Sequence, residues 1–174
     1  SKLKNEVIKY SKKLNITNLS ALRSGNISVR VKDKGVEGFY ITPSGMKYSS
    51  LKTKDIVFVS LKGNFDIKKN KPSSEWKFHQ DIYVNKKEAK AIVHAHSTCA
   101  TAVSAHQKNI PAFHYMVAVA GGEDLKCTKY ATFGTKQLSI NIIKGLKNRS
   151  ACLIANHGQV AFGSSLGKAF ELAQ

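Results

Sequence analysis

Three short apolar segments near the N-terminus, separated by turns, constrain the fold of this chain more than any other feature. In the first segment, apolar Ile27, Val29 and Val31 alternate with polar residues, which is the two-residue period of a half-buried strand. The second and third segments, residues 38–41 and 55–61, each run into a turn that contains glycine. Short connections join antiparallel strands, whereas parallel strands need a long crossover. The sequence therefore predicts a mainly antiparallel or mixed sheet.

Helical patterns alternate with further extended segments along the rest of the chain. The N-terminus opens with apolar residues at helical spacing, from Leu3 to Leu14, with lysines between them. Later strands are predicted at residues 91–96, 114–120 and 152–155, and later helices at 76–83, 97–106, 138–146 and 166–173. The chain has 174 residues, 42% of them hydrophobic, which is enough for one core. We expect a single α/β domain over residues 1–174, with helices covering the sheet.

Neither a membrane span nor a disulfide framework is expected. No run approaches twenty consecutive apolar residues, and the N-terminus lacks the apolar run and cleavage site of a secretory signal. Cys99, Cys127 and Cys152 form no Cys-x-x-Cys pair, and their apolar or small neighbours predict buried, inert thiols. Such cysteine usage suits a reducing compartment. We therefore expect a soluble, cytoplasmic protein without a membrane partner.

A formal net charge of +17, from 28 basic and 11 acidic residues, raises the question of nucleic-acid binding. Only Arg23, Arg30 and Arg149 are arginines, and the lysines are scattered along the chain. Base readout and bidentate phosphate contacts favour arginine, and no nucleic-acid-binding motif is present. We interpret the charge as a solvated lysine surface and expect no nucleic-acid partner. A positive field would still attract a phosphorylated substrate.

His94 and His96, separated by Ala95, are the sharpest chemical signal in the sequence. Residues two apart on a strand point to the same face, with Cα atoms roughly 6.6 Å apart, so the two imidazoles can converge on one metal ion. Imidazole nitrogens suit zinc at about 2.0–2.1 Å, and a catalytic zinc site needs a third protein ligand and an open position.

His157 and Glu75 are the candidates that complete such a site. His157 follows a predicted strand, where sites often form, and Glu75 lies at a predicted helix start. Glu75 is a candidate fourth ligand, a general base, or both in turn. The alternative is that the His-x-His pattern arises by chance and that His157 is only a turn residue. We favour the metal site because all these motifs occur in one short chain.

The remaining histidines are weaker candidates. His79 is one helical turn from Glu75, so it is expected to pack against that carboxylate or to steer it. His106 falls at a polar helix end and is expected to be solvated. His114 lies on a predicted strand and is interpreted as a core or supporting residue rather than a ligand.

Three turn or helix-start segments are candidates for anion binding. They contain Gly25 with Asn26, Ser44 with Gly45, and Ser73 with Ser74. Each offers free backbone N–H groups or short polar side chains, and a helix N-terminus adds partial positive charge. Each segment alone is more often only a turn or a cap. Together they predict an anion site only if the fold brings them side by side.

In this order and spacing, the motifs resemble those of the class II aldolase/adducin family, and within it they are most similar to the bacterial L-fuculose-1-phosphate aldolases. The resemblance extends from the first helix to the C-terminus. It is carried by GNISVR (25–30), ITPSG (41–45), KPSSEWKFH (71–79), AIVHAHS (91–97), IPAFHYMVAVAGG (110–122), YATFGT (130–135), LKNR (146–149) and NHG (156–158).

The resemblance implies a three-layer α/β/α sandwich with a central, mostly antiparallel sheet, assembled as a homotetramer with active sites between subunits. It implies a zinc ion, Zn2+, held by His94, His96 and His157. Glu75 would be a ligand in the resting site and an acid/base in turnover. Tyr115 aligns with the family's catalytic tyrosine, which protonates the aldehyde oxygen during carbon–carbon bond formation. The phosphate of the substrate would lie among Asn26, Ser44, Gly45, Ser73 and Ser74.

The implied reaction is the reversible cleavage of a 2-ketose 1-phosphate, with L-fuculose 1-phosphate as the leading substrate. Its products would be dihydroxyacetone phosphate and L-lactaldehyde, formed through an enediolate. A divalent cation that chelates the substrate oxygens stabilises the enediolate charge as a Lewis acid. A nearby carboxylate can then move the proton on the enediolate carbon. No lysine Schiff base is required.

The same residues are also compatible with other functions. Relatives with this fold and metal include pentulose-phosphate 4-epimerases and methylthioribulose-phosphate dehydratases. A non-enzymatic interaction domain like the adducin head would not need its metal ligands, whereas all three histidines and Glu75 are present here. A basic nucleic-acid-binding module would show strongly salt-dependent affinity.

Two departures from the family pattern concern the substrate site. Arg23 replaces a small residue in the loop before Gly25, where it would either bind phosphate or alter the loop. Family members also continue beyond the position of Gln174, with a C-terminal tail that contributes a tyrosine to a neighbouring site. We expect this tail either to lie outside the 174 residues or to be lacking.

Overall fold

The central element of the computed structural model, which describes residues 1–174, is a six-stranded sheet with strand order β3-β2-β1-β4-β6-β5. Each strand is antiparallel to its neighbours, which confirms the predicted antiparallel sheet. The strands are β1 (Asn26–Asp33), β2 (Val36–Ile41), β3 (Val57–Ser60), β4 (Ala91–Ala95), β5 (Ala151–Ile154) and β6 (Gly158–Gly163).

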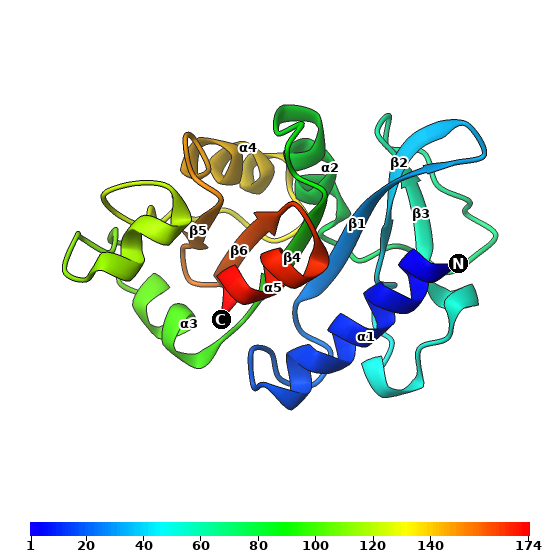
Figure 1. Cartoon of the computed structure of the whole chain (residues 1–174), viewed down its shortest axis with the longest axis horizontal. Helices are drawn as coiled ribbons and strands as arrows, with labels where there is room; N and C mark the ends of the chain where they lie inside the picture. The colour runs from blue at the N-terminus through cyan, green and yellow to red at the C-terminus, as the bar shows by residue number, and fades with distance from the viewer.

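Helices cover both faces of this sheet, so the fold is the expected three-layer α/β/α sandwich (Figure 1). Helices α1 (Lys2–Ile16) and α5 (Leu166–Ala173) pack on one face, and α2 (Trp76–Asn85) and α4 (Lys136–Gly145) pack on the other. The short α3 (Thr98–Ser104) contacts β5 and β6. Three 3-10 helices are η1 (Tyr48–Ser50), η2 (Thr53–Asp55) and η3 (Tyr115–Ala120).

The two faces of the sheet bury separate apolar cores, and β4 contributes to both. Val93 packs with the α1 and α5 side, whereas its neighbour Ile92 packs with the α2 and α4 side. This follows from the two-residue period of a strand. Because both faces are covered, all five residues of β4 are buried. Burial of a large apolar side chain such as Ile92 or Val93 contributes roughly 1.5–3 kcal/mol to stability.

Because helices cover both faces of the sheet, the prediction of a half-buried strand at residues 26–32 is wrong. The first four residues of β1 are buried, including the polar Ser28, because α2 lies over the face that the sequence pattern left to solvent. Ser28 is tolerated there because its hydroxyl has hydrogen-bond partners in His79 and Tyr83.

Residues 114–120 do not form the predicted strand. Tyr115–Ala120 is the 3-10 helix η3, and most of its side chains are exposed. A short apolar run has no periodicity that separates strand from helix, and this run has no strand beside it with which to pair.

Strand β6 (Gly158–Gly163), in contrast, was not predicted. It pairs with both β4 and β5 and lies next to the central strands. Its short apolar stretch is bounded by glycines, which are usually turn residues.

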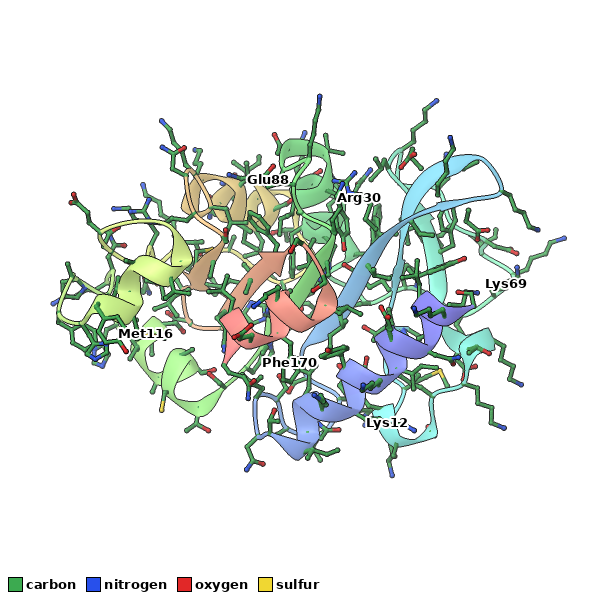
Figure 2. All side chains as sticks on the ribbon, viewed as in Figure 1. Lys12, Arg30, Lys69, Glu88, Met116 and Phe170 are labelled. Carbon is green, nitrogen blue, oxygen red and sulfur yellow. The ribbon has the colours of Figure 1, made fainter.

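Exposure of the cysteines and lysines tests two further expectations. Cys152 is buried and Cys127 is partly buried, but Cys99 on α3 is exposed, so the prediction of three buried thiols is wrong for Cys99. None of the lysines is buried, which confirms the solvated lysine surface; Lys12 and Lys69 in Figure 2 are examples. No helix combines the length and apolar character needed to cross a membrane.

Candidate metal centre and substrate cavity

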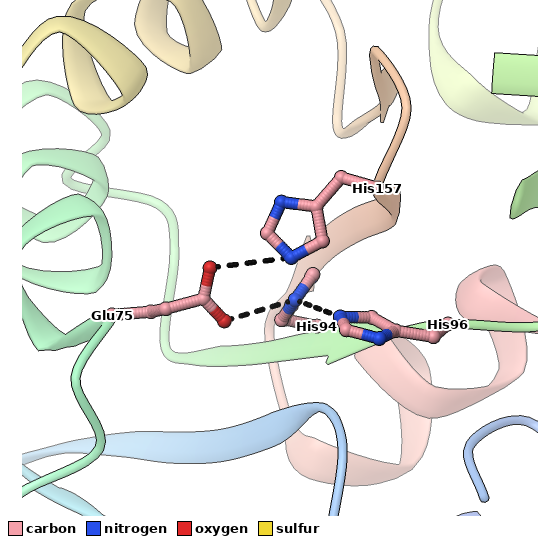
Figure 3. A group of neighbouring side chains, drawn as sticks. All are labelled: Glu75, His94, His96 and His157. Atoms are coloured by element: carbon pink, nitrogen blue, oxygen red, sulfur yellow. Dashed lines mark hydrogen bonds and ion pairs between the residues drawn. The ribbon is translucent and has the colours of Figure 1, made fainter. Parts of the chain in front are cut away.

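Glu75, His94, His96 and His157 meet at one point near the end of β4 (Figure 3). One ligand atom from each residue lies within 4.8 Å of the others. Glu75 comes from the start of α2, the two alternating histidines from β4 and the residue after it, and His157 from the turn between β5 and β6. The structure thus brings together the four residues that the sequence nominated as metal ligands.

A tight turn and a close strand approach deliver His157 to the cluster. Asn156 adopts a positive φ of 55°, which asparagine tolerates better than most residues. At Gly158, an added Cβ would lie 2.4 Å from the carbonyl oxygen of Ala95, so only glycine lets β6 approach β4 this closely. His157 therefore lies beside the β4 histidines because of its two neighbours in the chain.

The carboxylate of Glu75 faces the histidines instead of capping its own helix. Glu75 is the N-cap residue of α2 but makes no side-chain cap hydrogen bond. Its Oε2 lies 3.1 Å from His94 Nε2 and accepts a hydrogen bond of 3.0 Å from Asn26 Nδ2. Its Oε1 lies 3.4 Å from His157 Nε2. This Oε1 is buried and lacks a hydrogen-bond partner.

The donor set fits a single metal ion. The Nδ1–H of His94 donates to the carbonyl oxygen of Gln159 at 2.8 Å, which leaves the Nε2 lone pair directed at the cluster. His94 Nε2 and His96 Nε2 are 2.9 Å apart. Ligands about 2.1 Å from one ion at tetrahedral corners are separated by roughly 3.4 Å, close to the distances found here. The unpartnered Glu75 Oε1 is the kind of buried atom that a cation would satisfy.

Electrostatics keep two of the three imidazoles, His96 and His157, in the neutral form that metal binding needs. Burial lowers the pKa of His96 to about 3 and that of His157 to about 4, and the neighbouring His94 lowers both further. Burial alone would raise the pKa of Glu75, but His94 and His157 outweigh it and lower that pKa. Glu75 in turn raises the pKa of His94 in spite of its burial. Two neutral imidazoles and a carboxylate are therefore present at neutral pH.

A polar cavity of about 400 Å³ opens beside the cluster. It is lined by Glu75, His96 and His157 of the cluster and by the three predicted anion-binding segments. The fold therefore brings these segments side by side, as an anion site requires. Their role in phosphate binding stays a prediction. The lining includes all five residues nominated for it: Asn26, Ser44, Gly45, Ser73 and Ser74.

Arg23 also lines this cavity, and its guanidinium donates from Nη1 to the carbonyl oxygen of Gly45 at 2.9 Å. It is the only lysine or arginine in the lining. Tyr130, Phe133 and Asn156 line the cavity as well, although the sequence reasoning gave them no role. Tyr130 and Phe133 belong to the motif YATFGT (130–135), which carried part of the family resemblance. That motif was the only sequence signal that pointed to these two residues.

The remaining nominated residues lie away from the cluster or support it. Tyr115 on η3 is 78% exposed and does not line the cavity. His106 is exposed, as expected. His114 is exposed too, which corrects its interpretation as a core residue; its Nδ1 accepts a hydrogen bond from Met116 N at the start of η3. His79 is fully buried and contacts Asn26, a partner of Glu75.

Fold and cluster together define the class of protein: an antiparallel α/β/α sandwich able to bind one metal ion beside a polar cavity. Residues 5–174 match the family described as Class II Aldolase and Adducin N-terminal domain. The chain therefore belongs to the class II aldolase/adducin family, and it is an enzyme of the lyase class.

Individual relatives agree with this assignment. The L-fuculose phosphate aldolase of Haemophilus influenzae is 47% identical over 152 residues, which cover 87% of this chain and 68% of that protein. The 5-methylthioribulose-1-phosphate/5-deoxyribulose-1-phosphate aldolase of Rhodospirillum rubrum is 41% identical over 171 residues, or 98% of this chain and 75% of that protein. A solved structure of L-fuculose 1-phosphate aldolase has a TM-score of 0.93 and 41% identity, and the match covers 99% of this chain and 80% of that one.

Proposed function

We propose that this protein is a zinc-dependent aldolase that cleaves a 2-ketose 1-phosphate reversibly to dihydroxyacetone phosphate and an aldehyde. L-Fuculose 1-phosphate is the leading substrate, and L-lactaldehyde is then the aldehyde. The observation that carries the proposal is the cluster of three imidazoles and one carboxylate at the wall of a polar cavity. The similarity to L-fuculose phosphate aldolases supports the substrate.

His94, His96, His157 and Glu75 would hold the zinc ion. When bound, the ion supplies a Lewis acid that stabilises the negative charge of the enediolate. The direction of the His94 Nε2 lone pair and the unpartnered Oε1 of Glu75 support this assignment. A set of nitrogen and oxygen donors without sulfur is typical of catalytic zinc sites.

The phosphate group would bind where the three anion-binding segments line the cavity. Ser44, Ser73 and Ser74 offer hydroxyl donors, and the backbone N–H groups of their turns add further donors. Asn26 offers one side-chain N–H, because the other faces Glu75. Arg23 is the only lysine or arginine in the lining, and its positively charged guanidinium suits a phosphate dianion.

Two proton transfers complete the reaction. In the cleavage direction, a base removes the proton from the C4 hydroxyl, the C3–C4 bond breaks, and its electron pair forms the enediolate on C2 and C3. Glu75, after it has taken up a proton from solvent, delivers that proton to C3 and returns to the carboxylate, which yields dihydroxyacetone phosphate. Tyr115 is the proposed partner at the C4 oxygen. Its hydroxyl donates a proton there in synthesis, and its tyrosinate form accepts that proton in cleavage and releases it to solvent.

Because Tyr115 lies outside the cavity of its own chain, it would act in the site of a neighbouring subunit. We accordingly propose a homotetramer of single-domain subunits with active sites between them. The exposed apolar side chains on the segment around η3 support such contacts.

A second substrate is favoured by a specific observation. The Rhodospirillum rubrum relative is named as an aldolase for 5-methylthioribulose 1-phosphate and 5-deoxyribulose 1-phosphate. Both are 2-ketose 1-phosphates, so the phosphate, zinc and enediolate chemistry would be unchanged. Only the aldehyde fragment differs, and the part of the cavity near Tyr130 and Phe133 would have to accommodate it.

The test is a substrate panel with zinc-reconstituted protein. The three ketose phosphates are supplied separately, and dihydroxyacetone phosphate is detected by coupled reduction with NADH. We expect product from at least one ketose and faster turnover of L-fuculose 1-phosphate. Absence of dihydroxyacetone phosphate with all three, from protein that holds zinc, would rule out the proposal. Detection of a rearranged pentulose phosphate or a dehydrated product would instead establish one of the alternative reactions.

A further inference from the structure

A chain of five hydrogen-bonded side chains runs from the interior to the carboxylate of Glu75. Tyr83 OH lies 2.8 Å from Ser28 Oγ, which lies 2.7 Å from His79 Nδ1. On the other side of the ring, His79 Nε2 lies 2.5 Å from Asn26 Oδ1, and Asn26 Nδ2 lies 3.0 Å from Glu75 Oε2. Two of these residues come from β1 and three from α2 and its N-cap.

All five side chains are buried, and water has little access to the inner three. Ser28, His79 and Tyr83 are sealed between the sheet and α2, and Asn26 and Glu75 border the cavity. A buried polar network of this kind is stable only when each donor meets an acceptor.

The direction of every hydrogen bond in this chain follows from the carboxylate. An ionised Glu75 can only accept, so the amide nitrogen of Asn26 faces it and the amide oxygen faces His79. That oxygen also only accepts, so His79 must carry its proton on Nε2. His79 Nδ1 is then the acceptor for the Ser28 hydroxyl.

We infer that His79 is a positioning residue: its Nε2–H fixes the side-chain amide of Asn26 so that the amide holds Glu75 in place for the metal and the substrate. The inference rests on the proposed function for the metal and substrate, but the hydrogen-bond pattern itself does not. Burial, which lowers the pKa of His79 to about 3, is consistent with a neutral ring.

The orientation of the Asn26 side-chain amide affects both the metal cluster and the proposed phosphate site. One of its two side-chain N–H groups holds Glu75 Oε2, and the residue borders the cavity where the phosphate would bind. If the amide rotated by half a turn, two oxygens would face each other at the Glu75 contact. The carboxylate would lose a donor, and the phosphate site would lose one as well. Outer hydrogen-bond partners of metal ligands typically change metal affinity or activity by about tenfold to a hundredfold.

Nitrogen NMR of the unmodified protein tests the proton position without any variant. Histidine labelled with ¹⁵N distinguishes a protonated Nε2 from a protonated Nδ1, and the spectrum of a His79→Gln variant assigns the signals. We expect a neutral His79 ring with its proton on Nε2 in the metal-free and the zinc-loaded protein. A proton on Nδ1, or a charged ring at neutral pH, would overturn the inference.

Two amide variants then separate positioning from packing. In His79→Gln, the longer side chain can place an N–H near the position of Nε2 and still donate to Asn26. In His79→Asn, the shorter amide reaches only the position of Nδ1. Zinc affinity is measured by competition with a chelator, and kcat and KM with the ketose phosphate that the wild-type protein cleaves.

We expect His79→Gln to retain zinc affinity and kcat close to wild type. His79→Asn should weaken one or both by about tenfold to a hundredfold. Equal losses in the two variants, or no loss in either, would reduce His79 to a packing residue. If His79→Asn does not fold, the NMR result decides. If the wild-type protein cleaves none of the ketose phosphates, the proposed function fails, whereas zinc affinity and NMR still test the role of His79.

Discussion

The metal cluster and the segment around η3 are opposite kinds of surface within one chain. In the cluster, Glu75 is only 6% exposed and His94 is fully buried, and their positions are set by neighbouring strands and hydrogen bonds. On the η3 segment, Tyr115 is 78% exposed and Phe113 is 74% exposed. Met116, the neighbour of Tyr115, lies at one end of the long axis of the molecule in Figure 2.

The comparison shows which parts of the proposed active site a single chain provides. A single chain builds the donor set for a metal and the polar cavity beside it. The exposed aromatic side chains have no partner within the chain that would hold them near a substrate. Large exposed apolar side chains that gather on one segment often mark a contact with another protein. The two regions therefore predict different responses to mutation.

The largest effect is expected for His96→Ala, within the cluster. Removing one imidazole leaves an incomplete donor set. Zinc affinity should therefore fall by more than the tenfold to hundredfold loss that is typical when a hydrogen-bond partner of a metal ligand is mutated, and turnover should be lost. Metal content after dialysis measures this, with the exposed His106→Ala as the matched control. Unchanged zinc in His96→Ala would mean that the His-x-His pair is not a ligand pair.

The Glu75→Gln variant should separate zinc binding from turnover at the metal cluster. The amide keeps the size and one oxygen of the carboxylate but cannot carry a proton, so kcat should fall by about 10²–10⁴-fold. Zinc should remain bound, although more weakly. Parallel measurements of kcat and zinc content check both points. Turnover near the wild-type value would exclude Glu75 as the proton carrier.

Tyr115→Phe should act on turnover and leave the metal untouched. Because Tyr115 lies outside its own cavity, zinc affinity should be unchanged, whereas loss of a proton carrier should lower kcat by about a hundredfold. Tyr10→Phe, on the distant α1, is the control for loss of a hydroxyl. An equal fall in zinc affinity would show that the two regions are not separable as proposed.

The smallest expected effect is a dependence of stability on pH that originates in the buried region. Burial lowers the pKa of His79 to about 3, with a further contribution from His94 and a smaller opposing one from Glu75. An unfolded histidine titrates near 6.5, so between these pH values the unfolded chain binds a proton that the folded chain does not. Stability should therefore fall as pH drops through this window, by about 1.4 kcal/mol per pH unit for that proton.

Urea unfolding of the metal-free protein between pH 7 and pH 4 measures this slope. His79→Gln should reduce the slope by about 1.4 kcal/mol per pH unit, because glutamine does not titrate, while His96 and His157 still contribute. His106→Gln, at an exposed position, should leave the slope unchanged. The same slope in wild type and His79→Gln would mean that His79 is not the titrating group.

Much of the buried region could be predicted from the sequence because its signals are local. The alternation in β1, the apolar run of β4 and the two-residue spacing of His94 and His96 follow from strand geometry alone. The antiparallel sheet followed from short connections. His157 could be nominated because it follows a buried strand, although β6, which positions it, was missed.

The features that escaped prediction depend on contacts between distant segments. Residues 114–120 have an apolar composition typical of a buried strand, but no neighbouring strand is available and they form η3. Ser28 looked solvent-facing until α2 covered it. The partners of His79 lie 51 and 53 residues away in the chain, so no spacing rule could link them.

Zinc K-edge X-ray absorption of the reconstituted protein tests the metal centre most directly. We expect one zinc per chain, bound only by nitrogen and oxygen at about 2.0–2.2 Å, with the scattering pattern of three imidazoles. The His96→Ala variant should lose one imidazole from that pattern or bind no zinc. A sulfur ligand at about 2.3 Å, or a protein that binds no zinc at all, would contradict coordination by Glu75, His94, His96 and His157.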